Sequence, residues 1–132
     1  MTFEMRIDRA DGVGRGAYFV GVGSAGLQFF LVAPDAGAPL ELWSDQGVTG
    51  GQNFTGLTVP VGVWTHVEVT ITPRTEAVGG ATIEVPSGNR TFAIPTPDAG
   101  LPLTFRADVG LGAGSAGGSW TALYDNVTID WK

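Results

Sequence analysis

Two tryptophans beside glycine-rich loops are the residues best placed to contact a ligand. Trp43 precedes one such loop and Trp120 follows another. An exposed indole beside a loop can stack on a sugar ring or anchor a protein partner. The simpler alternative is that all four tryptophans belong to the core. We take Trp43 and Trp120, together with the polar residues Asp45, Gln52 and Asn53, as candidate ligand-binding residues.

Acidic residues in turns indicate a second kind of chemistry, the binding of calcium. Calcium takes about six to eight oxygen ligands from carboxylates, carbonyls and water. The chain has no linear D-x-D-x-D-G loop, so a site would have to be assembled from separate loops. The candidate ligands are Asp35, Asp98, Asp125 and Asn126, although Asp35 and Asp98 can equally serve to close their own turns. We expect that no cofactor is required and that calcium is an optional ligand.

Catalysis is not favoured by the residues available. The single histidine, His66, lies on the polar side of an alternating segment, and no G-x-S-x-G elbow accompanies it. Glu41 and Asp45 share one side of a predicted strand, as a glycosidase pair would require, but no dense acidic cluster surrounds them. We expect a protein that is not an enzyme, and a glycoside hydrolase-like activity is the weakest alternative.

The candidate residues are expected to lie on or beside strands. Two distant segments of the chain alternate between apolar and polar residues, which is typical of strands. The apolar positions of residues 64–72 and 124–131 are Val67, Val69, Ile71, Val127, Ile129 and Trp131. A period of two buries one face of a sheet and leaves the other face in water. The pattern predicts an all-β fold, a two-sheet antiparallel β-sandwich with these residues on its buried side.

About ten strands are expected, each bounded by Gly, Pro, Asn or Asp. They cover residues 3–8, 17–22, 27–32, 40–43, 54–59, 64–72, 81–85, 91–94, 103–109 and 120–131. Residues 17–22 and 27–32 are almost continuously apolar, which is typical of central strands covered on both faces. A spacing of roughly ten residues, with turns between, favours a sandwich or jelly roll.

Residues 21–26 and 112–117 both match the G-x-G-x-x-G pattern of dinucleotide-binding proteins. That motif functions only where the glycines lead into a helix whose N-terminus meets the pyrophosphate. Here predicted strands follow both runs, so we interpret them as hairpin loops.

The composition indicates one domain and argues against several partners. A chain of 132 residues, 43% of them hydrophobic, suits a single domain spanning residues 1–132. The net charge is -6 and Lys132 is the only lysine, which argues against nucleic acid. No apolar run approaches about 18 residues, so no membrane insertion is expected. The chain reads as a module of a larger bacterial protein, extracellular or at the cell surface, with its signal sequence outside this chain.

Residues 62–69 (G-V-W-T-H-V-E-V), 105–112 and 124–130 together resemble the concanavalin A-like lectin/glucanase superfamily, particularly its laminin G-like domains. G-V-W-T-H-V-E-V at 62–69 is similar to the family's glycine, tryptophan, two residues, valine pattern. Y-D-N-V-T-I-D at 124–130 resembles its closing strand, and F-R-A-D-V-G-L-G at 105–112 resembles its small-residue strand. The resemblance implies a two-sheet jelly roll with a concave face or loop rim for recognition of glycans or proteins, often with calcium. The family's alternating Glu, Asp, Glu catalytic motif is missing.

The expected function is that of a noncatalytic recognition module that binds carbohydrate or glycoprotein. The alternative is a structural or assembly domain that contacts other proteins through a sheet edge or an apolar face. Long apolar strands with few lysines along their edges would suit this alternative. The oligomeric state does not follow from the sequence.

Overall fold

The protein is built only of strands in the part of the chain that the structure describes. A computed structural model of the chain describes residues 1–10, 14–22, 27–35, 37–46, 51–72, 79–94, 105–111 and 119–130. The strands are β1 (Thr2–Ala10), β2 (Gly14–Val22), β3 (Leu27–Ala33), β4 (Leu40–Gln46), β5 (Gln52–Val59), β6 (Thr65–Thr72), β7 (Gly79–Val85), β8 (Gly88–Ile94), β9 (Phe105–Leu111) and β10 (Trp120–Thr128). The predicted all-β class and the ten predicted strands are confirmed, with boundaries that shift by a few residues.

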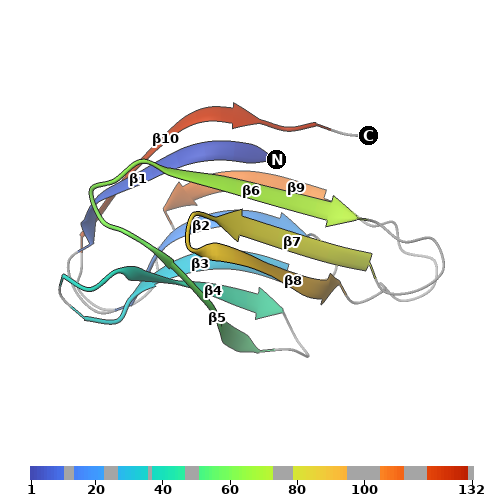
Figure 1. Ribbon diagram of the computed structural model, residues 1–132, viewed down its shortest axis with the longest axis horizontal. Coiled ribbons are helices and arrows are strands. Elements are labelled where there is room, and N and C mark those ends of the chain that lie inside the picture. Colours follow the sequence, from blue (N-terminus) through green and yellow to red (C-terminus); the bar gives the residue numbers. More distant parts are fainter. Residues whose placement is uncertain are drawn as a thin grey trace.

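The strands form two antiparallel sheets of five strands each. One sheet has the order β10-β1-β6-β7-β8 and the other has the order β5-β4-β3-β2-β9. Figure 1 shows the first sheet in front of the second, with β1 beside β10. The central strand of the second sheet is β3, which agrees with the prediction that residues 27–32 form a central strand.

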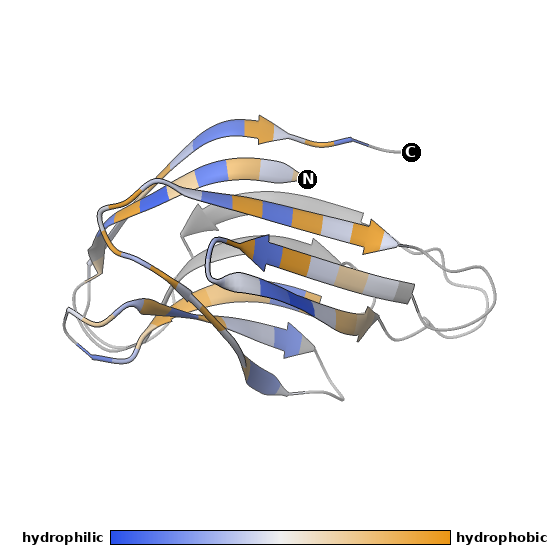
Figure 2. Ribbon diagram, viewed as in Figure 1, coloured by the Kyte–Doolittle hydropathy of each residue, from blue (hydrophilic) through white to orange (hydrophobic). Residues whose placement is uncertain are grey.

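Alternate residues of both sheets meet in one core. Along β6, Val67 and Val69 are buried while the residues between them are exposed, as the period of two predicts. Figure 2 shows the same alternation of hydrophobic and hydrophilic residues along β1, β6 and β7. Phe29 on β3 lies edge-on to Phe92 on β8, with ring centroids 5.4 Å apart, so the aromatic contact joins the two sheets. The core cluster contains residues of both sheets, which supports a sandwich.

The prediction for the end of the chain is wrong in two positions. Val127 and Ile129 are 47% and 44% exposed, although their alternation predicted a buried side. Asn126 has a positive φ of 53° and the register with β1 shifts nearby, so the regular alternation of β10 is interrupted there. Trp120, Ala122 and Tyr124 of the edge strand β10 pack against the core, whereas these two residues beyond Asn126 do not. Trp131 lies outside the described residues.

The segments that follow the two glycine-rich runs are strands. The strands β3 and β10 begin at Leu27 and Trp120, so the G-x-G-x-x-G runs are followed by strands, as predicted, and not by helices. The runs themselves lie outside the described residues, apart from positions 21 and 22. Among the described residues we find no helix with the length and hydrophobicity needed to span a membrane.

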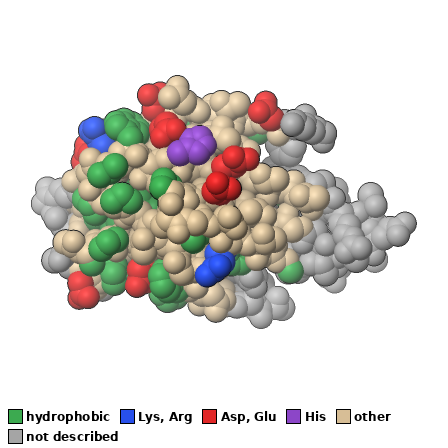
Figure 3. All heavy atoms as spheres, in the orientation of Figure 1, with side chains coloured by type: hydrophobic (Ala, Val, Ile, Leu, Met, Phe, Trp, Pro, Cys, Tyr) green, Lys and Arg blue, Asp and Glu red, His purple; other side chains and the backbone are tan. Residues whose placement is uncertain are grey.

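The exposed face of the first sheet carries two glutamates directly opposite each other. Glu68 on β6 and Glu84 on β7 are register partners, and both are exposed. Figure 3 shows acidic side chains grouped beside the single histidine on this face. Like charges at opposed positions of neighbouring strands repel each other.

We therefore expect Glu84→Lys to raise the free energy of unfolding by about 0.2–1 kcal/mol, because an opposite-charge pair replaces a repulsive one. Urea unfolding at low and high salt measures the effect, which should shrink as salt screens the charges. Glu84→Gln is the control, since it removes the repulsion without adding attraction. Its free energy of unfolding should lie between those of the wild type and Glu84→Lys. Equal stability of all three proteins at low salt would contradict the repulsion.

Candidate functional site

The outer face of the β5-β4-β3-β2-β9 sheet carries a pair of aromatic rings. Trp43 on β4 and Phe54 on β5 are register partners, and their ring centroids lie 6.1 Å apart with planes inclined by 33°. Phe54 is 45% exposed and Trp43 is half-buried. Phe30, the partner of Trp43 on β3, lies on the same face but is only 1% exposed. Trp43 and Phe54 therefore form an aromatic platform, and Phe30 lies next to it within the sheet.

Hydrogen-bonding side chains border the aromatic platform. The Trp43 Nε1 donates to Glu41 Oε2 at 2.9 Å, which fixes the orientation of the indole. On the other side, Gln52 Nε2 donates to Asp45 Oδ2 at 3.1 Å. Glu41, Trp43 and Asp45 alternate with core residues along β4, so all three lie on the outer face. Such a surface suits a ligand that has an apolar face and a polar edge.

A bulge in β5 sets the position of Phe54. Two residues of β5, Thr55 and Gly56, are extra relative to β4, where the register shifts after Leu42. The buried Thr55 hydroxyl donates to the Leu42 carbonyl at 2.7 Å and accepts from the Leu57 amide at 3.1 Å. Gly56 has a φ of 82°, a backbone conformation that favours glycine. The bulge places Phe54 opposite Trp43, a position that Gly56 would occupy in a regular pairing.

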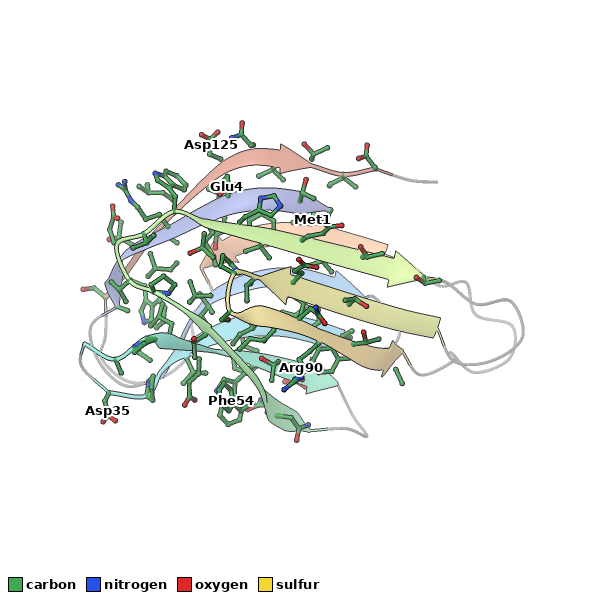
Figure 4. All side chains as sticks on the ribbon, in the orientation of Figure 1. Met1, Glu4, Asp35, Phe54, Arg90 and Asp125 are labelled. Carbon is green, nitrogen blue, oxygen red and sulfur yellow. The ribbon has the colours of Figure 1, made fainter. Side chains whose placement is uncertain are left out.

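Two side chains from the opposite sheet hold β5 at this edge of the sandwich. Arg90 Nε on β8 donates to the Thr55 carbonyl at 2.8 Å. Ser87 Oγ accepts from the Thr58 amide at 3.0 Å and donates to the Thr58 carbonyl at 2.9 Å. Both β5 and β8 are edge strands, and Figure 4 shows Phe54 and Arg90 along this edge. These contacts place the strand that carries Phe54 and also satisfy its edge backbone groups.

We expect Ser87→Ala to lower the free energy of unfolding by about 0.5–1 kcal/mol, because water replaces a side chain that made two hydrogen bonds to Thr58. Hydrogen exchange measures the local effect, and the Thr58 amide should exchange faster in the variant. Thr91→Ala is the matched control, since it removes an exposed hydroxyl contact of 2.9 Å to Thr82 and leaves Thr58 unchanged. Unchanged exchange of Thr58 in Ser87→Ala would contradict the role of Ser87.

The structure brings three of the five predicted ligand-binding residues together. Trp43, Asp45 and Gln52 lie on one face within two adjacent strands. Asn53 is exposed next to Gln52, but it has the opposite strand parity to the platform. Trp120 belongs to β10 in the other sheet, where it packs against the core. The structure thus separates the two tryptophans that the sequence grouped together.

The predicted calcium ligands are not gathered in one place. Asp35 lies in the turn after β3, where its carbonyl accepts from the Ala38 amide at 3.3 Å. Asp125 Oδ1 accepts from the Asn126 amide at 2.8 Å, close to the positive φ of Asn126. Figure 4 shows Asp35 near the bottom of the view and Asp125 near the top, and Asp98 lies outside the described residues. Within the described ranges, no three His, Cys, Asp or Glu side chains are grouped so that they could hold a metal ion.

The single histidine lies on the exposed face of the first sheet. His66 Nδ1 is 2.7 Å from Glu4 Oε1, and the side chains are partly exposed. Its position on the polar face of β6 confirms the sequence interpretation. A carboxylate beside a surface imidazole is a contact between neighbouring strands, here between β1 and β6.

Sequence reasoning did not include Phe54 among the site residues. A signal for it exists, because Phe54 shares its strand parity with Gly56 and Thr58, opposite to the core residues Leu57 and Val59. A single exposed apolar side chain is ordinary, and Phe54 indicates a binding surface only together with the neighbouring Trp43 ring. Its pairing with Trp43 depends on the bulge and on register, which the sequence does not reveal.

The described residues form an all-β, sandwich-like fold of two antiparallel sheets, one of which carries an exposed aromatic and polar surface. Comparisons of the chain with protein-family models, curated proteins and solved structures found no match.

Proposed function

We propose that the protein is a noncatalytic recognition module that binds carbohydrate, free or on a glycoprotein, at an extracellular or cell-surface location. The observation that carries the proposal is the paired Trp43 and Phe54 rings, bordered by the hydrogen-bonded side chains of Glu41, Asp45 and Gln52. The binding surface is the outer face of β4 and β5.

A pyranose ring matches this surface chemically. One face of the ring presents C–H groups, which pack on an aromatic side chain, while hydroxyl groups project from its edge. Carboxylate and amide oxygens accept hydrogen bonds from hydroxyls, and the Gln52 amide nitrogen can donate one. Because the indole orientation is held by Glu41 at 2.9 Å, Trp43 presents a preformed surface to the sugar.

Neutral glycans fit this surface better than acidic ones. Glu41 and Asp45 place two carboxylates beside the platform, and the whole chain carries a net charge of -6. Sulfated or uronic-acid glycans would meet repulsion from both groups. We therefore propose a neutral, hydroxyl-rich ligand.

The spacing of the two carboxylates supports recognition over hydrolysis. Glu41 and Asp45 are four residues apart on one strand, which separates their Cα atoms by roughly 13 Å. Glycosidases hold their two carboxyl groups about 5–10 Å apart on either side of the bond that is cleaved. Glu41 is also bound to the Trp43 indole, which limits its freedom to transfer protons.

We also propose that the two sheets form a jelly roll of the concanavalin A-like type. The chain alternates between the sheets, with β2 to β5 in one, β6 to β8 in the other, and β9 and β10 divided between them. The pairing of β1 with β10 supports this arrangement, because it places the two ends of the described chain side by side.

A glycan array with neutral and acidic glycans tests the function, followed by NMR titration of a neutral glycan that binds. We expect binding of neutral glycans with and without calcium, and shifts of the Trp43 indole and Gln52 amide signals. Failure to bind any glycan under either condition would contradict the proposal. So would signal shifts confined to the opposite sheet.

A further inference from the structure

A second exposed surface lies on the first sheet, away from the aromatic platform. It consists of four hydrophobic residues, which we call the apolar patch: Val61, Val63, Trp64 and Leu123. Their exposed fractions are 40%, 52%, 44% and 37%, respectively. Three of them belong to the connection between β5 and β6, and Leu123 belongs to β10.

Arg6 lies between the two parts of the apolar patch. Arg6 on β1 is the register partner of Leu123, and its Cζ lies 5.1 Å from the centre of the Trp64 ring. The connection that carries Val61 and Val63 is tied to β1 by a hydrogen bond of 2.8 Å from the Gly62 amide to the Ile7 carbonyl. Figure 3 shows hydrophobic side chains grouped on one side of this face. Single exposed apolar residues are ordinary. A group of exposed apolar residues whose backbone is fixed by a hydrogen bond is typical of an interaction surface.

The charges around the patch are negative. Glu4 and Asp125 are register partners in the row next to Arg6 and Leu123. The positive charge of Arg6 is offset by Asp8, whose Oδ2 accepts from Arg6 Nη2 at 3.0 Å. The hydrogen bond to Asp8 raises the pKa of Arg6, and the guanidinium, charged in any case, is paired with that carboxylate. The described border of the patch therefore has an excess of carboxylates.

We propose that the apolar patch docks a protein segment with a hydrophobic centre and lysine or arginine residues around it. Hydrophobic side chains would cover Trp64 and Leu123, and the basic groups would meet Glu4 and Asp125. Charge complementarity of this kind steers association and selects the partner. A second copy of the chain is disfavoured, because two acidic borders and two net charges of -6 would face each other.

The size of the patch indicates a transient contact. A stable interface buries about 800 Å² on each partner, from about 20–30 residues a side. Four exposed hydrophobic side chains with an acidic border provide only the centre of such an interface. The proposal is independent of carbohydrate binding, because Trp64 and Leu123 of the patch lie beside Arg6 on β1, whereas the aromatic platform lies on β4 and β5.

Two synthetic peptides of equal length test the proposal, one with leucine and tryptophan flanked by lysines and one with the same apolar residues flanked by glutamates. Fluorescence anisotropy of each labelled peptide measures binding to the wild type and to two double variants. Trp64→Ser with Leu123→Ser removes the patch. Val127→Ser with Ile129→Ser is the matched control, since these residues are 47% and 44% exposed but lie beyond Asn126 on β10.

We expect the lysine peptide to bind the wild type and the Val127/Ile129 variant equally well, and the patch variant at least about tenfold more weakly. The glutamate peptide should bind the wild type at least about tenfold more weakly than the lysine peptide. Equal binding to the patch variant and the wild type would overturn the proposal. Sedimentation showing a wild-type dimer that Trp64→Ser dissociates would overturn it in favour of self-association. Circular dichroism verifies that every variant is folded.

Discussion

Trp43→Ala is expected to weaken binding of a neutral glycan roughly 30-fold or more, because a central aromatic contact typically accounts for about 2 kcal/mol or more. The substitution removes one of the two rings of the platform and the donor that holds Glu41. Titration calorimetry with a glycan from the array measures the change. The fold should persist, because Trp43 is not a member of the core cluster.

Trp64→Ala is the control for this prediction. Both variants lose one indole, but Trp64 is 44% exposed and lies in the connection before β6, beside Arg6 on β1. Its glycan affinity should equal that of the wild type. Similar affinities of the Trp43 and Trp64 variants would show that the sugar does not bind on the platform.

Phe29→Ala is expected to lower the free energy of unfolding by about 3–5 kcal/mol, the range for deletion of a buried aromatic side chain. Phe29 is fully buried on the central strand β3, and its edge contact with Phe92 joins the two sheets. The cavity would lie between the sheets, where neighbouring strands cannot close it without breaking their register. Urea denaturation followed by circular dichroism measures the loss.

Phe54→Ala is the comparison for Phe29→Ala, and it should affect glycan affinity but not stability. Phe54 is 45% exposed, so its removal should change stability by less than about 1 kcal/mol. Glycan affinity should fall instead, because Phe54 is the other ring of the platform. A large loss of stability in Phe54→Ala, or a small one in Phe29→Ala, would contradict the assignment of the two faces of the sheet.

Most of the fold could be predicted because strand periodicity is a local property. Val67 and Val69 are buried as their alternation predicts, and β3 is a central strand as its continuous apolar run predicts. The same reasoning failed for Val127 and Ile129, since burial also requires an opposite layer. Beyond Asn126 the edge strand β10 lacks that cover.

The candidate site could be predicted only in part. Asp45 and Gln52 come together with Trp43 because β4 and β5 are adjacent in sequence and joined by a short connection. Trp120 was placed in the same group on the grounds of its neighbouring glycines, but β10 pairs with β1 in the other sheet. The sequence contains no local signal for that pairing.

The amino-acid sequence by itself determined that this protein is made of strands, where they lie, and for most of them which side is apolar, because side chains alternate with every residue along an extended chain. Only the tertiary structure decided that Phe54 lies beside Trp43, that Ser87 and Arg90 hold β5, and that Trp64 joins Leu123 in one patch. These neighbours are set by register, by a bulge and by the packing of one sheet on another. The contacts of Ser87, Arg90 and Leu123 depend on residues far apart in the chain, and a bulge changes which residue of β5 pairs with Trp43, so local pattern cannot specify them.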